Sequence, residues 1–178
     1  MGLLRPSVSA TVLAGAAAGA FGSWVKVLVE TPMQQLGEAW WPPAEGQKDL
    51  VGADPAGHPE QMPPAVVARR LWKRLTGGDL DDASALQAQQ VIHYAFGAAY
   101  GVVYALLVRG LPAAKVGLGA PAGAVLYGLT HGSGLPAIGV QPPPTKLPRA
   151  AVFWEGGSHV VFGIATELAR AMLSLPIR

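Results

Sequence analysis

The chain contains no cysteine among its 178 residues. This absence excludes a disulfide framework, a thiolate metal site and a cysteine nucleophile. Charged residues are also scarce, because Asp, Glu, Lys and Arg make up 13% of the chain, whereas soluble domains contain about 25%. Together with 51% hydrophobic residues and a mean hydropathy of +0.32, this scarcity indicates a membrane protein.

The sequence lacks the features that nucleic-acid binding and catalysis require. The formal net charge is +2 and the pI is near 9.1, but the basic residues are scattered over loops and segment ends. We therefore expect no nucleic-acid partner. The sequence has no phosphate-binding glycine loop followed by lysine, no HExxH and no serine, histidine and aspartate pattern, which predicts that the protein is not an enzyme.

Four apolar segments are each close to the ~20 residues that a helix needs to cross a bilayer. They predict an all-α, polytopic membrane protein in which residues 1–178 form a single domain, a bundle of four transmembrane helices. The expected crossings are 8–30, 91–108, 116–138 and 150–173. The third is expected to be broken, because Pro121, Pro136 and several glycines interrupt its backbone hydrogen bonds. The alternative for the first is a signal peptide, with Arg5 as its basic residue.

A Pro- and Gly-rich loop is predicted over residues 31–90. Residues 64–76 of this loop combine apolar and basic side chains at helical spacing, which is typical of a short interfacial amphipathic helix. A soluble cap helix is the alternative. Trp40 and Trp41 are expected at the level of the lipid headgroups. The charges of the short second connection and the C-terminal tail favour an orientation with both termini in the cytoplasm.

Ionisable residues occur inside the apolar segments, where a charge near the bilayer centre costs about 2.5–3.5 kcal/mol. In the fourth segment such residues fall on one helical face. In the first, a lysine and a glutamate four residues apart can form an ion pair, or can reach water separately. We expect these side chains to face the inside of the bundle. The candidate proton-linked or ion-binding residues are His93, His131, Glu155, His159, Lys26, Glu30 and Glu167.

Three interpretations of these residues are open. Imidazoles beside a carboxylate can take up or relay protons as the pH falls, which predicts a proton-responsive channel, transporter or sensor. Zinc or another transition metal can be held by the same groups, and we expect no other cofactor. The third interpretation is that they only join helices by hydrogen bonds. The candidate metal ligands are His93, His131, Glu155 and His159.

Glycines four residues apart predict faces where helices pack closely. The pairs are Gly15 and Gly19, Gly97 and Gly101, and Gly119 and Gly123. Besides joining helices within one chain, such faces can bind a second copy or a larger complex. The alternative function is therefore a non-catalytic membrane scaffold or accessory subunit. The partners that we expect are the lipid bilayer and a homo-oligomer or membrane complex.

An ordered set of motifs runs through the apolar segments: SWVKVLVETP (23–32), VIHYAFGAAYGVVYALL (91–107), GLTHGSGLPAIGVQPPP (128–144) and WEGGSHVVFGIATELAR (154–170). This set resembles the YagU-like family of small bacterial inner-membrane proteins, and the resemblance leaves out residues 36–82. It implies a four-crossing inner-membrane protein that is associated with tolerance of acid and has no settled biochemical activity. The matching positions are Lys26, Glu30, Pro32, His93, His131, Glu155, Gly157, His159 and Glu167.

Overall fold

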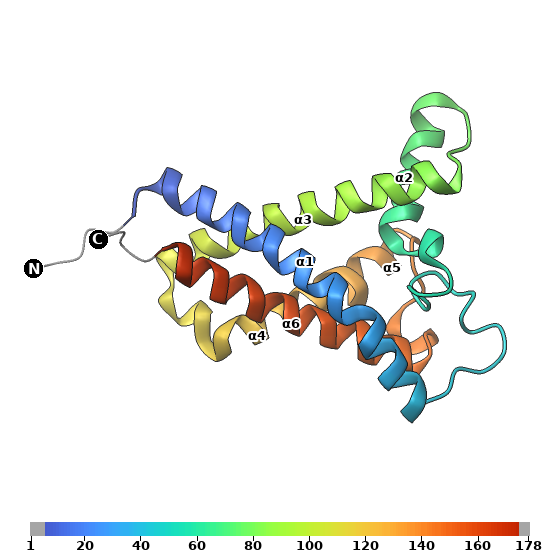
Figure 1. The fold of residues 1–178 in the computed structure, drawn as a ribbon. Helices are drawn as coiled ribbons and strands as arrows, with labels where there is room; N and C mark the ends of the chain where they lie inside the picture. The colour runs from blue at the N-terminus through green and yellow to red at the C-terminus, as the bar shows by residue number, and fades with distance from the viewer. Residues whose placement is uncertain (1–5, 175–178) are drawn as a thin grey trace, which may run out of the picture.

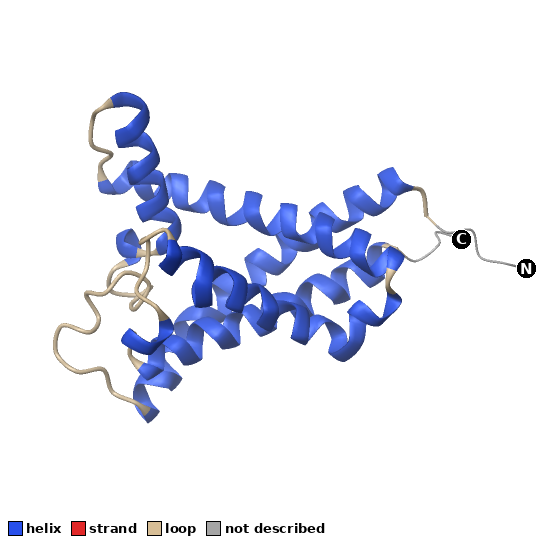
Figure 2. Cartoon of the chain, turned by 180° about the vertical axis from the view of Figure 1, so that it is seen from behind, coloured by secondary structure: helices blue, strands red, loops and turns tan. Residues whose placement is uncertain are grey.

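The computed structural model describes residues 6–174, and their regular elements are helical (Figures 1 and 2). The predicted all-α class is therefore confirmed. The α-helices are α1 (Val8–Trp40), α2 (Pro63–Thr76), α3 (Asp82–Gly110), α4 (Ala120–Leu129), α5 (Leu135–Ala137) and α6 (Arg149–Leu173). The shorter turns are η1 (Pro59–Gln61), η2 (Pro112–Gly119) and η4 (Pro144–Lys146), which are 3-10 helical, and η3 (Thr130–Gly134), which is π-helical.

Two helices, α1 and α3, are long and apolar enough to cross a membrane. The expected set of four crossings is therefore supported for two segments. Helix α6 has 25 residues and is about 37 Å long at 1.5 Å per residue, but its ionisable side chains lower its hydropathy. Helix α4 has only 10 residues, because the third segment is interrupted on both sides by η2 and η3.

Helices α1 and α3 extend beyond their apolar segments into the predicted loop. Helix α1 continues to Trp40, and α3 begins at Asp82. The side chain of Asp81 caps α3 by accepting a hydrogen bond from the Ser84 N–H at 2.9 Å, which is a frequent helix start. The extension of α1 packs against α6, where Gly37 lies beside Phe153. Capping and packing, rather than the length of the apolar run, therefore determine where these helices end.

Helix α1 packs against both α3 and α6, and α4 packs against α6 (Figure 1). Glycines lie at these contacts. A Cβ atom on Gly19 would overlap the carbonyl oxygen of Gly97, and one on Gly15 would lie 2.6 Å from the carbonyl oxygen of Gly101. Close backbone approach of this kind requires residues without side chains. Gly119 and Gly123 lie in the same way against the backbone of α6, so the predicted glycine pairs join helices within the chain.

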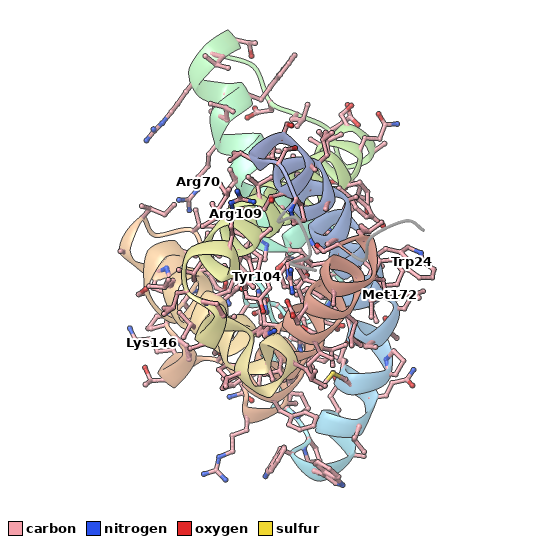
Figure 3. All side chains as sticks on the ribbon, turned by 90° about the vertical axis from the view of Figure 1, so that its left-hand side faces the viewer. Trp24, Arg70, Tyr104, Arg109, Lys146 and Met172 are labelled. Atoms are coloured by element: carbon pink, nitrogen blue, oxygen red, sulfur yellow. The ribbon has the colours of Figure 1, made fainter. Side chains whose placement is uncertain are left out.

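Large apolar side chains point outward from these helices. Leu13 of α1 is 71% exposed and Val103 of α3 is 65% exposed. The buried residues of α1 are instead small or polar: Gly15, Ala18, Gly19, Gly22, Ser23, Lys26, Gln34 and Gly37. Seen along the bundle, Trp24 and Met172 lie at the periphery and Tyr104 lies inside (Figure 3). This distribution is the reverse of that in a soluble helix, which buries its large apolar residues.

The segment between α1 and α2 is held by a buried carboxylate. Asp54 is 5% exposed and accepts hydrogen bonds from Gln34 Nε2 at 2.6 Å and from the Gly57 N–H at 2.8 Å. The ammonium of Lys48 lies 3.2 Å from Asp54 and 3.0 Å from Glu38. These contacts tie the segment to the end of α1, so this part of the predicted Pro- and Gly-rich loop is a folded cap.

The pKa of Asp54 makes this cap sensitive to acid. Burial alone would raise the pKa, but the hydrogen bonds from Gly57, Gln34 and Lys48 outweigh burial and lower it below the ordinary 3.8. A carboxyl whose pKa is lowered by folding stabilises the fold above its unfolded pKa, and this contribution is lost as the pH falls through the folded pKa. The cap should therefore keep its stability down to about pH 4 and lose it below.

We expect Asp54→Asn to weaken the cap at neutral pH and to remove the acid-dependent loss. Hydrogen exchange of residues 41–62, expressed as protection factors, measures both effects. Asp49→Asn is the matched control, because Asp49 belongs to the same segment but its side chain is 70% exposed. Protection that is the same in Asp54→Asn as in the wild type at neutral pH would show that the carboxylate does not hold the cap.

Candidate functional site

A cavity of about 450 Å³ lies between α1, α3, η3 and α6. Residues between 55 and 67, Leu126 of α4 and Leu135 of α5 also line it. The sequence-predicted residues that line it are Lys26, Glu30, His93, His131, Glu155 and His159. Four separate parts of the chain therefore bring six predicted residues to one cavity.

Helix α6 contributes a buried polar face to this cavity. Glu155 and His159 are 2% and 5% exposed, and Ser158 and Thr166 are 0% exposed. Residues three and four apart lie on the same side of a helix, so one face of α6 turns all of these groups toward the other helices. The predicted inward polar face of the fourth segment is confirmed.

His131 and Glu155 form a pair of titratable groups that joins η3 to α6. His131 Nδ1 lies 3.1 Å from Glu155 Oε1 and 2.7 Å from Gln141 Oε1. The amide of Gln141 donates from Nε2 to Glu155 Oε2 at 3.2 Å. Because an ionised carboxylate only accepts hydrogen bonds, the Gln141 carbonyl faces His131. Nδ1 of His131 therefore carries the hydrogen when the ring is neutral, which leaves Nε2 as an acceptor.

Gln141 is a site residue that the sequence did not single out. It is 4% exposed and bridges the two members of the pair. It precedes three prolines, in a stretch that reads as a short extended connector. Only the return of this connector toward α6 places the amide beside Glu155, and no local pattern marks that position.

His159 lies beside the pair, on the same side of α6 as Glu155. Its Nδ1 lies 2.8 Å from the backbone oxygen of Glu155, so Nδ1 donates and Nε2 is left as an acceptor. The ring centroids of His131 and His159 are 4.9 Å apart, at an angle of 66°. Tyr127 contacts both, with centroids 6.0 Å from His131 and 5.7 Å from His159. The two imidazoles thus share one small space.

The π-helical turn η3 carries His131. Pro136 has no N–H to donate to the preceding turn, and the Ser133 hydroxyl donates to the backbone oxygens of Gly128 and Leu129 at 2.9 and 3.1 Å. The predicted break in the third segment is therefore present at this turn. Single π-helical turns are frequent at functional sites. Here the turn places the imidazole of His131 against α6.

His93 lines the cavity but does not contact His131, Glu155 or His159. Its Nε2 lies 3.2 Å from the backbone oxygen of Ser23, and the Ser23 hydroxyl lies 3.4 Å from the backbone oxygen of His93. These two contacts join α3 to α1. The geometry of His93 therefore fits the interpretation in which the histidine joins two helices by hydrogen bonds.

Lys26 and Glu30 form the ion pair that their spacing predicts. Their side chains are 8% and 17% exposed, so both turn into the protein, and the alternative in which they reach water separately does not apply. The ammonium of Lys26 also lies 5.9 Å from the ring centroid of Trp154. The cavity therefore contains one cation that is matched by an anion on the same helix.

A transition metal could be held by three of the four residues predicted for that role. His131, Glu155 and His159 each offer one ligand atom, and these atoms lie within 4.8 Å of one another. Two imidazoles and a carboxylate are a common set for zinc. His93 is not part of this group, because the backbone of α1 holds it on another wall of the cavity. The predicted set of four is therefore reduced to three.

Glu167 is not brought to the cavity. It forms a two-pronged pair with Arg170, whose Nε and Nη2 lie 2.6 and 2.7 Å from its carboxylate oxygens. Eight residues along α6 separate it from His159, which is about 12 Å along the helix axis. Glu167 is buried, at 4% exposed, but lies apart from the residues that line the cavity, because a shared helical face does not imply a shared depth.

A comparison with protein families matches residues 78–168 to the family described as "Protein of unknown function (DUF1440)". The chain belongs to this family. The match confirms the resemblance to the YagU-like family. It covers the part of the chain that contains α3, α4 and η3, together with most of α6, and so includes His93, His131, Glu155 and His159. Helix α1, with Lys26 and Glu30, lies outside the matched region.

No curated protein and no solved structure matches the chain. The family description gives no activity. The geometry of the cavity must therefore support any functional proposal.

Proposed function

We propose that this chain is an integral, non-catalytic protein of the bacterial inner membrane, with four crossings formed by α1, α3, the α4–α5 unit and α6. The outward apolar and inward polar distribution supports this placement. Large apolar patches on the surface of a soluble protein mark interaction or aggregation sites, whereas lipid solvates exposed apolar side chains. In the most apolar 18-residue stretches of α1 and α3, 33% and 28% of the residues are buried. The core helix of a soluble protein is, by contrast, mostly buried.

The orientation with both termini in the cytoplasm is part of this proposal. Helix α1 begins and α6 ends at the same end of the bundle (Figure 1). Arg109, Lys115 and Arg170 line one pocket there, together with Pro6 and Ser174. Basic residues in short connections favour the cytoplasmic side. The cavity, which is lined by residues before α2, then lies toward the opposite side.

The cavity is proposed to respond to protons, and the observation that supports this is the 3.1 Å contact between His131 Nδ1 and Glu155 Oε1. Because Nδ1 already carries a hydrogen, an added proton binds at Nε2 and makes an imidazolium beside a carboxylate. Histidine has a reference pKa of about 6.5 and changes charge between pH 5 and 8. Protonation would therefore strengthen the contact between η3 and α6.

Charged and titratable groups face this pair from each neighbouring element. They are Lys26 and Glu30 on α1, His93 on α3, Tyr127 on α4 and His159 on α6. Residues of η1 and α2 add apolar lining, including Met62 and Val67. A second proton on His159 would be opposed by the Lys26 ammonium and by the imidazolium of His131. The proton on His131 is therefore the one that acts on the contact between η3 and α6.

We expect acid to raise the hydrogen-exchange protection of residues 130–141 about tenfold, which corresponds to about 1.4 kcal/mol. The measurement uses the full chain in lipid nanodiscs from about pH 7.5 to 4.5, a range that brackets the histidine reference pKa. Glu155→Gln and His131→Gln should remove the change, because each removes one member of the pair. Proton flux into liposomes, measured across the same pH range, distinguishes a protein that conducts protons from one that only senses them.

Asp79→Asn is the control for removal of one negative charge, because the side chain of Asp79 is 84% exposed and does not line the cavity. It should behave as the wild type. A pH response that persists in both cavity variants would contradict the proposal. Stoichiometric transition metal in the purified protein, lost in His159→Ala, would assign the site to metal binding instead.

Assembly with a second copy or a larger membrane complex is retained as a proposal, but it requires a surface other than the glycine pairs. These pairs are already in contact with α3, α1 and α6 of the same chain. The scaffold alternative therefore has no remaining support from the glycine spacing.

A further inference from the structure

The cavity opens sideways between α1 and α3. The two helices touch where Gly19 meets Gly97 and diverge toward the end that carries α2 (Figure 1). Val27 of α1 and Phe96 of α3 both line the cavity, and they are 38% and 50% exposed. The cavity therefore reaches the outer surface between them. In the proposed membrane placement, this opening faces lipid.

The walls of the cavity are divided between apolar and polar side chains. The apolar lining includes Val27, Ile92, Phe96, Leu126, Leu135 and Phe162. The polar lining includes Glu155, His131 and His159, which lie close together. A volume of about 450 Å³ falls within the range of small-molecule sites, about 300–1,000 Å³. This combination of size and lining suits an amphiphilic small molecule.

Three of the polar lining residues offer acceptor atoms that are not used within the described part of the protein. Nε2 of His131 and Nε2 of His159 are left as acceptors, because the Nδ1 atoms donate to oxygens. Gln89 also lines the cavity, and its Oε1 is buried without a hydrogen-bond partner among the described residues. An unpaired buried acceptor is costly unless a ligand or water supplies a hydrogen. A ligand that brings hydrogen-bond donors would therefore satisfy these acceptors.

The charge of the lining is negative. Lys26 is matched by Glu30, whereas Glu155 contacts the Gln141 amide and the His131 imidazole. The described lining residues therefore include two carboxylates but only one ammonium, and Glu155 has no lysine or arginine partner among them. A buried carboxylate favours a cation and repels a second anion. The aromatic rings of Phe96 and Phe162 add faces that attract cations.

We propose that this cavity binds an amphiphilic organic cation, a protonated amine with an apolar tail. The ammonium would donate to Glu155 and to the free imidazole nitrogens, and the tail would lie along Phe96 and Phe162 toward the opening. The proposal rests on the membrane placement given under the proposed function. It does not rest on the proton response of the His131 and Glu155 pair.

The experiment uses three probes with one skeleton and different head groups: phenylbutylammonium, phenylbutyrate and phenylbutanol. Isothermal titration calorimetry measures their binding to the full chain in nanodiscs at neutral pH, with empty nanodiscs as the blank. We expect saturable binding of the ammonium only. Equal binding of phenylbutyrate, or heat that does not exceed the blank, would overturn the proposal.

Two pairs of variants locate the binding. Glu155→Gln should weaken phenylbutylammonium binding at least about tenfold, while Asp79→Asn leaves it unchanged. Phe96→Ala should weaken it several-fold, while Val103→Ala, at an exposed position of the same helix, does not. The second pair keeps the test valid if Glu155→Gln fails to fold. Unchanged affinity in Phe96→Ala and in folded Glu155→Gln would exclude this cavity.

A failure of the ammonium-binding proposal can be distinguished from a failure of the proposed proton response. If residues 130–141 show no pH response but the ammonium binds through Glu155, only the proton proposal fails. If the pH response is present and the ammonium does not bind, only the present inference fails.

Discussion

Gly19→Leu is expected to destroy the packing of α1 against α3 and to cost at least about 3 kcal/mol, the upper part of the range for overpacking. The three atoms nearest to a Cβ at this position are all backbone atoms, the oxygen and carbon of Gly97 and the Cα of Gly101. A flexible side chain can move aside, but a helix backbone cannot. The two helices must therefore separate, and the ion pair and cavity beyond the contact should be lost with them.

Ala17→Leu is the matched control for this substitution. Ala17 lies two residues away on the same helix and is exposed, so the added side chain should point outward and change the free energy of unfolding by about 0.5 kcal/mol or less. Unfolding by SDS in mixed micelles measures both variants. If Gly19→Leu unfolds at the same SDS fraction as Ala17→Leu, the close contact between α1 and α3 does not exist in the protein.

Removal of either member of the Lys26 and Glu30 pair is expected to cost about 3–5 kcal/mol, because the remaining charge is left buried and uncompensated. Lys26→Met leaves the carboxylate of Glu30 without its partner, and Glu30→Gln leaves the ammonium. The double variant removes both charges. We expect it to lie within about 1 kcal/mol of the wild type, since neutral replacements of a buried pair are often tolerated.

A double-mutant cycle on the free energy of unfolding measures this coupling. The exposed pair of Lys73 and Asp79, with nitrogen and oxygen 2.8 Å apart and side chains 64% and 84% exposed, is the control and should show no measurable coupling. A double variant of Lys26 and Glu30 whose loss equals the sum of the two single losses would mean that the charges do not compensate each other.

Helical periodicity accounts for the features that could be predicted. Glu155 and His159 are four residues apart, and so are Lys26 and Glu30, which places each pair on one side of its helix. An ionisable group in an apolar segment avoids lipid because exposure is costly. The inward direction of these side chains, together with the close packing at glycine pairs, therefore followed from the amino-acid pattern.

The position of each group along the bundle axis could not be predicted in the same way. Glu167 shares a face with His159 but lies at another depth, where it pairs with Arg170. His93 lines the same cavity as His131 and His159 but contacts the backbone of Ser23 rather than Glu155. Periodicity gives the direction of a side chain around its own helix, but the register between two helices depends on how all of their contacts fit.

The sequence by itself determined that this is an all-α chain with apolar segments whose few ionisable and small residues share inward faces, because helix geometry and the cost of exposing charge to lipid act locally. The tertiary structure decided which of these residues meet. The π-helical turn of η3 and the return of the connector at Gln141 bring His131 to Glu155. Such contacts join residues far apart in the chain, so they depend on the simultaneous packing of several helices.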